Sequence, residues 1–166
     1  ESQAFEPHEW KNDYPNPAFV RMTDRDAFWA AKIIMQFTPK ELLAIVQTGQ
    51  LSDPEQERYF HRVLVERQHK SARYYMNRVN PLDEFEVSDN GLRFANLSER
   101  YGFADAGTRY EMSWSVYDND TGTVRSLSDT VTRTDTLLPL PASPVLTGDT
   151  YLMAEIRSRD RGWVRT

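Results

Sequence analysis

The sequence predicts an α+β protein in which an N-terminal subdomain of three helices packs on a C-terminal antiparallel β-sandwich of immunoglobulin or fibronectin type. Three observations predict this architecture. Helix start signals recur three times before residue 81, apolar side chains change from a helical period to alternation after Pro81, and turn sequences then follow at short intervals. We therefore expect a helical subdomain over 1–81 and a sandwich over 82–166.

The composition supports a packed protein and excludes several classes of function. Hydrophobic residues make up 39% of the chain and aromatic residues 12%, which argues against disorder. The net charge of -5 gives no bulk attraction to nucleic acid or to an anionic membrane. No apolar run approaches the roughly 20 residues of a membrane span. Because the chain has no cysteine, disulfides, thiolate catalysis and cysteine-ligated zinc are excluded.

The first 22 residues mix aromatic side chains with three prolines and show no regular period. Proline blocks helix continuation, so we expect an irregular arm. The aromatic residues of the arm, among them Trp10 and Tyr14, either close the protein's own core or dock on a neighbouring domain.

A first helix is predicted over 24–37. Thr23 is a suitable N-cap, and Asp24 and Asp26 place negative charge in the first turn, where the helix dipole favours it. Apolar residues surround nearly the whole helix, and only Lys32 and Gln36 form a polar edge. Such a helix is typically buried, so we expect it to be the central helix of the subdomain.

Two further capping sequences predict a helical hairpin. The stretch TPKE (38–41) supplies a cap, an N1 proline and a capping-box glutamate, and Gly49 is expected to end that helix in the left-handed conformation. The stretch SDPEQ (52–56) starts a third helix, which should run to about Val79 because Asn80-Pro81 stops it. The short link between the two helices is typical of an αα-hairpin.

The buried face of the third helix turns polar halfway along, where it presents Arg67, Ser71 and Arg78. An arginine on such a face must be paired or solvated. Either it ties the helix to the acids at positions 83, 84 and 86, or the polar stretch is an interface with another domain or a protein partner. Acidic residues at the start of this helix disfavour DNA reading. The predicted partner-binding residues are Trp10, Tyr14, Arg67, Ser71 and Arg78.

Alternation after Pro81 predicts the strands. Asn90-Gly91 favours a type I′ hairpin turn, and every second residue from Tyr110 to Val116 is apolar, which indicates one buried face. A last hairpin is expected from 150–158 and 162–166, after a loop that crosses between sheets.

The sequence contains no recognisable site for catalysis, a metal or a cofactor. His8, His61 and His69 lack the spacing of metal ligands, and DNDTG (118–122) reads as a turn rather than a calcium loop. We therefore predict no catalytic residue, no metal and no cofactor.

Three stretches, YPNPAFVRMTDRDAFWAAKIIMQFT (14–38), GQLSDPE (49–55) and NRVNPLDEF (77–85), resemble a region of large uncharacterised proteins of environmental bacteria. The resemblance covers roughly residues 10–85 and implies no activity. It implies that the chain is a C-terminal part of a larger polypeptide.

These observations favour a non-catalytic interaction or structural module of a larger bacterial protein, periplasmic or secreted rather than cytoplasmic. Its partners would be other domains of the same polypeptide or another protein. Two alternatives stay open: an accessory domain of a hydrolase-type enzyme whose active site lies elsewhere, and a carbohydrate-binding sandwich that uses Tyr117 and Trp163 as platforms.

Overall fold

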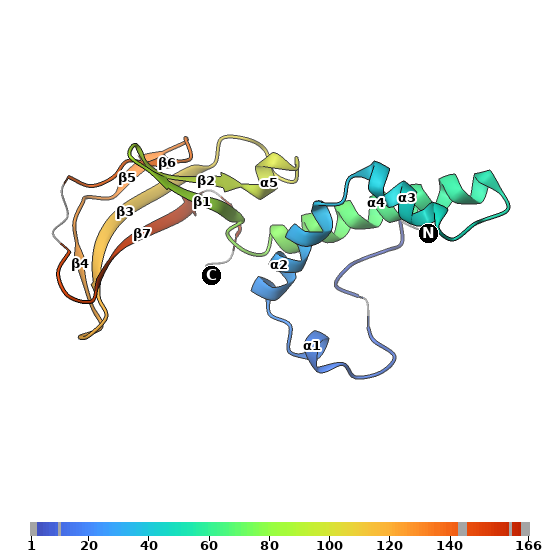
Figure 1. The fold of residues 1–166 in the computed structure, drawn as a ribbon, viewed down its shortest axis with the longest axis horizontal. Coiled ribbons are helices and arrows are strands. Elements are labelled where there is room, and N and C mark those ends of the chain that lie inside the picture. Colours follow the sequence, from blue (N-terminus) through green and yellow to red (C-terminus); the bar gives the residue numbers. More distant parts are fainter. Residues whose placement is uncertain (1–2, 10, 143–145, 160, 164–166) are drawn as a thin grey trace. The chain divides into compact units, whose positions relative to one another are not determined.

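The computed structural model describes residues 3–9, 11–142, 146–159 and 161–163. Over these residues it contains five helices and two antiparallel sheets, which confirms the mixed helix and sheet class (Figure 1). The chain divides between Val79 and Asn80 into two compact units, each of which is described by itself.

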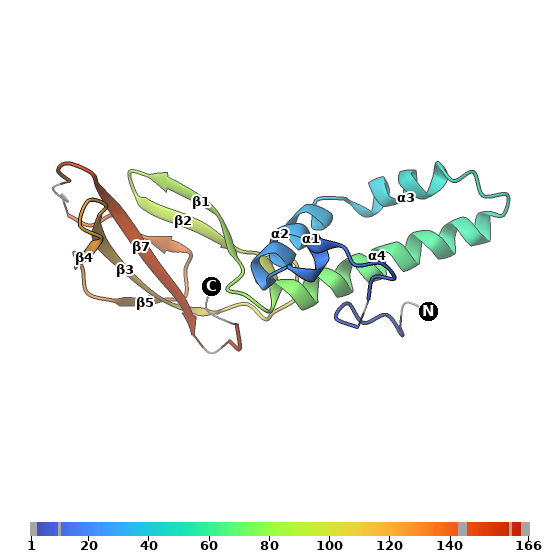
Figure 2. The same ribbon diagram turned by 90° about the horizontal axis from the view of Figure 1, so that it is seen from below.

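The first unit is helical, and its longest helix, α4, is the one against which both α2 and α3 pack (Figures 1 and 2). The predicted starts of these three helices are confirmed, since Thr23, Thr38 and Asp53 are their N-caps. The helices are α1 (Pro17–Val20), α2 (Asp24–Met35), α3 (Pro39–Gln47) and α4 (Pro54–Met76).

Two capping boxes hold the starts of α2 and α3. The Thr23 backbone N–H donates to Asp26 Oδ2 at 2.9 Å, and the Thr38 N–H donates to Glu41 Oε2 at 2.7 Å. These backbone bonds, with the threonine hydroxyl bonds, lower the pKa of both carboxyl groups. Each box satisfies donors that the helix itself leaves free.

The prediction for the end of α3 is wrong in its detail. The left-handed residue in the link is Gln50, with φ 49°, and not Gly49. The side chain of Gln47 bridges the link, because its Nε2 donates to Glu57 Oε1 at 3.0 Å. The helical hairpin is therefore present. Its link lacks the predicted glycine cap and contains the Gln47–Glu57 side-chain hydrogen bond.

The expectation that the first helix is central and buried is also wrong. In α2 only Ala27 and Ala31 are buried, whereas Trp29 is 63% exposed. The two alanines are 3% and 1% exposed, on the helix that packs against α4. Apolar residues all round the helix could not reveal which face packs inward.

One buried side chain joins the end of α2 to α4. Gln68 is 9% exposed, and its Nε2 donates to the carbonyl oxygens of Ile34 at 2.6 Å and Phe37 at 2.9 Å. Ile34 lies in the last turn of α2 and Phe37 follows its C-cap, so both carbonyls are at the end where a helix leaves carbonyl groups without regular partners. Gln68 therefore acts as a C-terminal cap delivered from a neighbouring helix.

The second unit contains both sheets. In one sheet the order is β1-β2-β6, and in the other β3 is central, with β4 and β5 along one edge and β7 along the opposite edge (Figure 2). A short helix, α5 (Leu97–Arg100), follows β2. The strands are β1 (Leu82–Ser88), β2 (Gly91–Asn96), β3 (Arg109–Asp118), β4 (Thr123–Ser126), β5 (Val131–Arg133), β6 (Leu137–Leu138) and β7 (Thr150–Arg159).

Side chains from both sheets form one hydrophobic cluster. The alternation predicted for β3 is confirmed, because Tyr110, Met112, Trp114 and Val116 are each at most 5% exposed. Trp114 Nε1 donates to the Pro139 carbonyl at 2.7 Å, so its one polar atom is satisfied. The buried members of the cluster are Leu82, Leu92, Phe94, Tyr110, Met112, Trp114 and Leu138.

The first hairpin has a different turn from the one predicted. Ser88 pairs with Gly91, so Asp89 and Asn90 form the loop, and neither has the positive φ that a type I′ turn requires. Gly91, with φ 138°, begins β2 and lies against β6, where an added Cβ would stand 2.3 Å from the Leu138 carbonyl oxygen. The glycine is thus required by a close approach of two strands.

The predictions for the later turns and strands are confirmed only in part. In the predicted turn at 118–122, the Thr121 N–H donates to Asp118 Oδ1 at 2.9 Å, and β3 and β4 flank it. The strand expected to return from β3 is split into β4 and β5. Of the last hairpin, β7 is present, and residues 164–166 of its second strand lie outside the described residues.

Candidate functional site: the arm cavity

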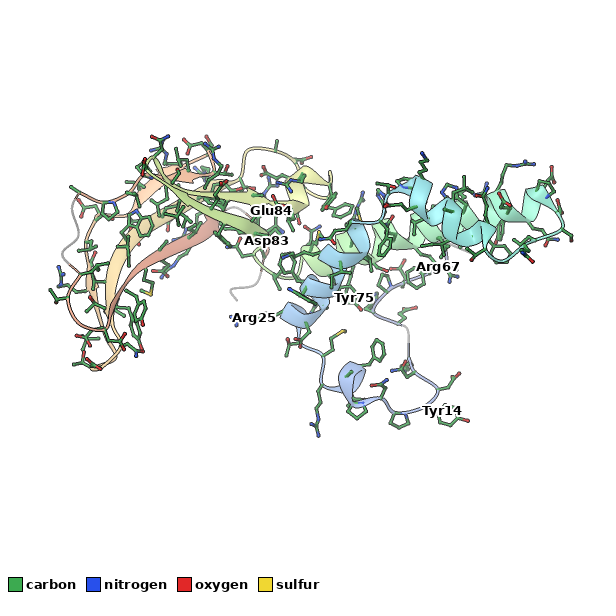
Figure 3. All side chains as sticks on the ribbon, in the orientation of Figure 1. Tyr14, Arg25, Arg67, Tyr75, Asp83 and Glu84 are labelled. Carbon is green, nitrogen blue, oxygen red and sulfur yellow. The ribbon has the colours of Figure 1, made fainter. Side chains whose placement is uncertain are left out.

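The first part of the arm lies along the second half of α4. Lys70 Nζ donates to the carbonyl oxygens of Gln3 at 3.0 Å and Phe5 at 3.2 Å, and the Arg67 guanidinium stands 5.0 Å from the centroid of the Phe5 ring. The Tyr75 hydroxyl donates to the Pro7 carbonyl at 3.3 Å. Figure 3 shows Arg67 and Tyr75 on α4 beside this segment. The polar face predicted on the third helix is therefore occupied in part by the chain's own arm.

A second set of contacts joins the start of α2 to the end of α4. Arg78 donates to Asp24 through Nε at 2.6 Å and through a terminal nitrogen at 3.1 Å, and its guanidinium lies 5.4 Å from the Tyr74 ring. The bond to Asp24 raises the pKa of Arg78. The His8 ring stacks on Tyr74 with centroids 5.2 Å apart. Arg78 thus has an ion-pair partner within the helical unit.

The arm, α1, α2 and α4 line a half-open cavity of about 610 Å³, here called the arm cavity. Its volume lies within the range of small-molecule and anchor pockets. One side is apolar, and the other carries groups that can form hydrogen bonds. The lining residues are Pro7, His8, Lys11, Asn12, Asp13, Pro15, Phe19, Val20, Met22, Ala27, Ala30, Ala31, Ile34, Ser71 and Tyr75.

Short side chains on α2 keep the cavity open. Ala27, Ala30 and Ala31 present only methyl groups, and Ile34 extends the same apolar wall by one turn. A larger residue at any of these positions would fill part of the space. On the α4 side, burial raises the pKa of the Tyr75 hydroxyl, with the neighbouring Tyr74 as a second cause.

Several polar groups at the cavity have no partner within the described part of the chain. The Ser71 hydroxyl, the Lys11 ammonium and the Asp13 carboxylate make no hydrogen bond or ion pair there. Lys11 and Asp13 carry opposite charges, so the mouth of the cavity has no strong net charge. Such a site suits an uncharged amphipathic group, with an apolar body against α2 and polar atoms near Ser71 and Asn12.

The wall of the arm cavity continues onto the outer face of α2. Trp29, Ile33 and Phe37 are spaced four residues apart and are 63%, 40% and 44% exposed. At 100° per residue Trp29 and Ile33 lie on the side of α2 turned away from Ala31, with Ala30 and Ile34 between the two sides, and Phe37 follows the end of the helix. We call Trp29, Ile33 and Phe37 the outer stripe.

The structure places the predicted partner-binding residues in three environments. Tyr14 is 85% exposed in the outer part of the arm, away from α4 (Figure 3). Arg67 and Arg78 contact groups of their own chain, and Ser71 lines the arm cavity. Trp10 lies outside the described residues.

Sequence reasoning missed Lys70 and Tyr75, which hold the arm, and it missed the outer stripe. The signal for the stripe was present in the apolar residues all round α2, which we interpreted as evidence of burial. No local signal indicated Lys70, because its partners all lie in the distant arm: two backbone carbonyls and the Glu6 carboxylate, 3.8 Å from Nζ.

The aromatic residues predicted as sugar platforms lie in the second unit. Tyr117 is half-buried and pairs across the strands with Tyr151, which is 55% exposed, while the Arg161 guanidinium stands 5.7 Å from the Trp163 ring. Within the described ranges no three histidine or acidic side chains are grouped to hold a metal ion. No helix in those ranges has the length and apolar character to cross a membrane.

Comparisons with family models, curated proteins and solved structures found no match.

Proposed function

We propose that this chain is a non-catalytic interaction module that binds a protein partner, or another domain of a larger polypeptide, through the outer stripe and the arm cavity. The observation that carries the proposal is the exposure of Trp29 and Ile33 on one face of α2 and of Phe37 just after the helix. Contiguous exposed apolar surface marks protein contacts, and tryptophan is enriched among the residues that dominate binding energy.

The predicted partner-binding residues take different parts in this proposal. Tyr14 and Ser71 would contact the partner directly, because one is exposed and the other lines the cavity without a partner of its own. Arg67 and Arg78 would position the arm and α2 on α4. Trp10 stays a predicted partner-binding residue.

We further propose that the second unit is an immunoglobulin or fibronectin-like sandwich, and that the helices of the first unit form a subdomain. The shared hydrophobic cluster and the strand orders β1-β2-β6 and β4/β5-β3-β7 support the sandwich. In this proposal the sandwich is the structural part of the module.

Site-specific photo-crosslinking in the organism that produces the protein tests the interaction proposal. A photoreactive phenylalanine analogue is placed at Trp29, at Tyr14 and, as a control, at Arg58, whose side chain is 68% exposed on α4. Discrete adducts from Trp29 and Tyr14, with none from Arg58, are expected. Equal adducts from all three positions, or none from Trp29, would contradict the proposal.

One observation favours carbohydrate binding by the β unit as a second candidate. Tyr117 and Tyr151 are directly opposite each other, and Asn119 Nδ2 donates to Asp149 Oδ2 at 2.6 Å beside them. Tyrosine rings next to a carboxylate and an amide can bind a sugar. Titration with oligosaccharides followed by tyrosine fluorescence tests this candidate, and Tyr151→Ala must abolish any response.

A further inference from the structure

Strand β7 has one paired edge and one open edge. β3 pairs with all ten of its residues, and the Asn119 N–H donates to the Asp149 carbonyl at 3.0 Å at the start of this ladder. Backbone groups alternate in direction along a strand, so odd-numbered residues of β7 bond to β3 and even-numbered residues point away. Asn80 Nδ2, which donates to the Ile156 carbonyl at 3.4 Å, agrees with this alternation.

No strand in the described part of the chain pairs with the outward edge. The backbone N–H and C=O groups of Leu152 and Ala154 point outward from this edge. The side chains of these residues and of Ile156 pack against the core cluster, yet they are only half-buried. Met112 and Trp114, beside them on β3, are at most 5% exposed. The hydrophobic core is therefore open along β7.

Natural sheets protect such an edge, because an unpaired strand is a template for another strand. Here the protection is confined to one end, where Asn80 bonds to the Ile156 carbonyl and accepts from the Ser158 hydroxyl at 2.6 Å. The edge from Thr150 to Ala154 carries no such cover among the described residues.

The side chains of β7 that face the core are self-complementary. Ala154 is the small residue at the centre of this face. Two positions away on either side stands a branched apolar residue, Leu152 or Ile156. Four positions away on either side stands a hydroxyl residue, Thr150 or Ser158. An antiparallel pair of two identical strands centred on Ala154 would place Leu152 opposite Ile156 of the second copy. A two-fold interface requires this kind of self-match.

The outward face matches in the same register. Tyr151 would lie opposite Arg157 of the second copy, a pairing that allows a cation–π contact. Asp149 at the start of the strand would lie opposite Arg159 of the second copy, so opposite charges meet at both ends of the pair. Arg157 and Arg159 also have acidic partners in their own chain, which keeps these charges oriented.

We propose that β7 pairs antiparallel with β7 of a second copy of this chain, about a two-fold axis at Ala154, so that the two β3–β7 sheets become one. The pair would form about six new backbone hydrogen bonds from Leu152, Ala154 and Ile156 of the two copies. Asn80 must release the Ile156 carbonyl for this to occur. Because one strand pair is a small interface, we expect a reversible dimer in the micromolar range.

Sedimentation equilibrium of the full chain over a wide micromolar range tests the proposal, together with amide hydrogen exchange. The expected result is a monomer–dimer equilibrium in which the Leu152 and Ala154 amides exchange more slowly as concentration rises. A monomer at every concentration would overturn the proposal. Protection of these amides that does not change with concentration would also overturn it, since it would indicate a strand from the same chain.

Proline scanning gives the matched variants. Ala154→Pro removes an N–H that faces the open edge, so the fold should persist and the association constant should fall about tenfold or more. Glu155→Pro removes an N–H bonded to β3 and should destabilise the sheet itself. If Ala154→Pro does not fold, Asn80→Ala provides the test instead. This variant frees the Ile156 carbonyl and should raise the association constant of the dimer. An unchanged association constant counts against the proposal.

Trp29→Glu separates this dimer from association through the outer stripe. It should leave the β7 dimer unchanged while weakening the partner contact proposed above. A dimer that Trp29→Glu abolishes and Ala154→Pro leaves intact would refute the β7 pairing and support the stripe.

Discussion

Replacement of Gly91 by alanine tests the close approach of β2 and β6. An ideal Cβ at this position would stand 2.3 Å from the Leu138 carbonyl oxygen and 2.9 Å from both Leu138 C and Pro139 Cα. These are backbone atoms, so rotation of a side chain cannot relieve the contact. The φ of 138° is itself a conformation that alanine rarely adopts.

The two effects add to a large loss of stability. The unfavourable φ costs about 1–3 kcal/mol. Moving β6 away by about 1 Å to restore van der Waals contact disturbs the packing of Leu138, which is 2% exposed, and we assign about 1–3 kcal/mol to that repacking. We therefore expect Gly91→Ala to lower the free energy of unfolding by about 2–6 kcal/mol.

Urea unfolding followed by tryptophan fluorescence measures this loss, because Trp114 is buried in the same cluster. Gly122→Ala is the matched control: Gly122 also has positive φ, 68°, but nothing lies within 4 Å of its added Cβ. That control should cost only about 1–2 kcal/mol. If the two variants lose the same stability, β6 does not lie against Gly91 and the reasoning fails.

Three further outcomes follow from the same contacts. Tyr110→Phe should cost about 1–2 kcal/mol in urea unfolding, since it leaves the buried amide of Asn96 without the hydroxyl that it contacts at 2.8 Å. The lowered pKa of Glu41 means that its cap stabilises α3 above its ordinary pKa of 4.5 and that this contribution is lost as pH falls through the folded value. Glu41→Gln should therefore reduce the loss of helical circular dichroism signal as the pH is lowered. If the signal falls with pH as steeply as in the unchanged protein, the Glu41 cap does not cause the loss. Lys70→Met should speed amide exchange in 3–9 while the exchange of α4 stays constant; equal protection in both proteins would show that the ammonium does not hold the arm.

Helix starts were predictable because they depend on neighbouring residues alone. Thr23 with Asp26, and Thr38 with Glu41, contain in four residues all the groups that the capping box uses. The burial of alternate residues in β3 was predictable for a similar reason, since the pleat dictates the alternation.

The errors concern features that distant residues decide. Gly91 is required by Leu138, and that contact, forty-odd positions away, leaves no trace in the hairpin sequence. The hairpin predicted from Asn90-Gly91 is therefore present, but the type I′ turn on which we based the prediction is not. The burial of α2 likewise depends on which side α4 contacts, and its sequence is apolar on nearly every side.

The candidate site was predicted in part. The change from apolar to polar along α4 correctly indicated that Arg67 and Arg78 need partners, and both have one. The identity of those partners could not be predicted, because Phe5 depends on the path of the arm and Asp24 on how α2 packs on α4. The arm cavity itself arises from alanines, which carry no chemical signature in a sequence.

The Gln68 amide has a consequence for how this chain can vary. Both of its N–H groups reach the carbonyls of Ile34 and Phe37 only when α2 has one rotational setting about its own axis. Deleting or inserting one residue between Ala31 and Ile34 would rotate Trp29 by about 100° relative to that amide. Related sequences that share this surface should therefore keep the length of that segment constant, and length differences should collect in the link between α3 and α4.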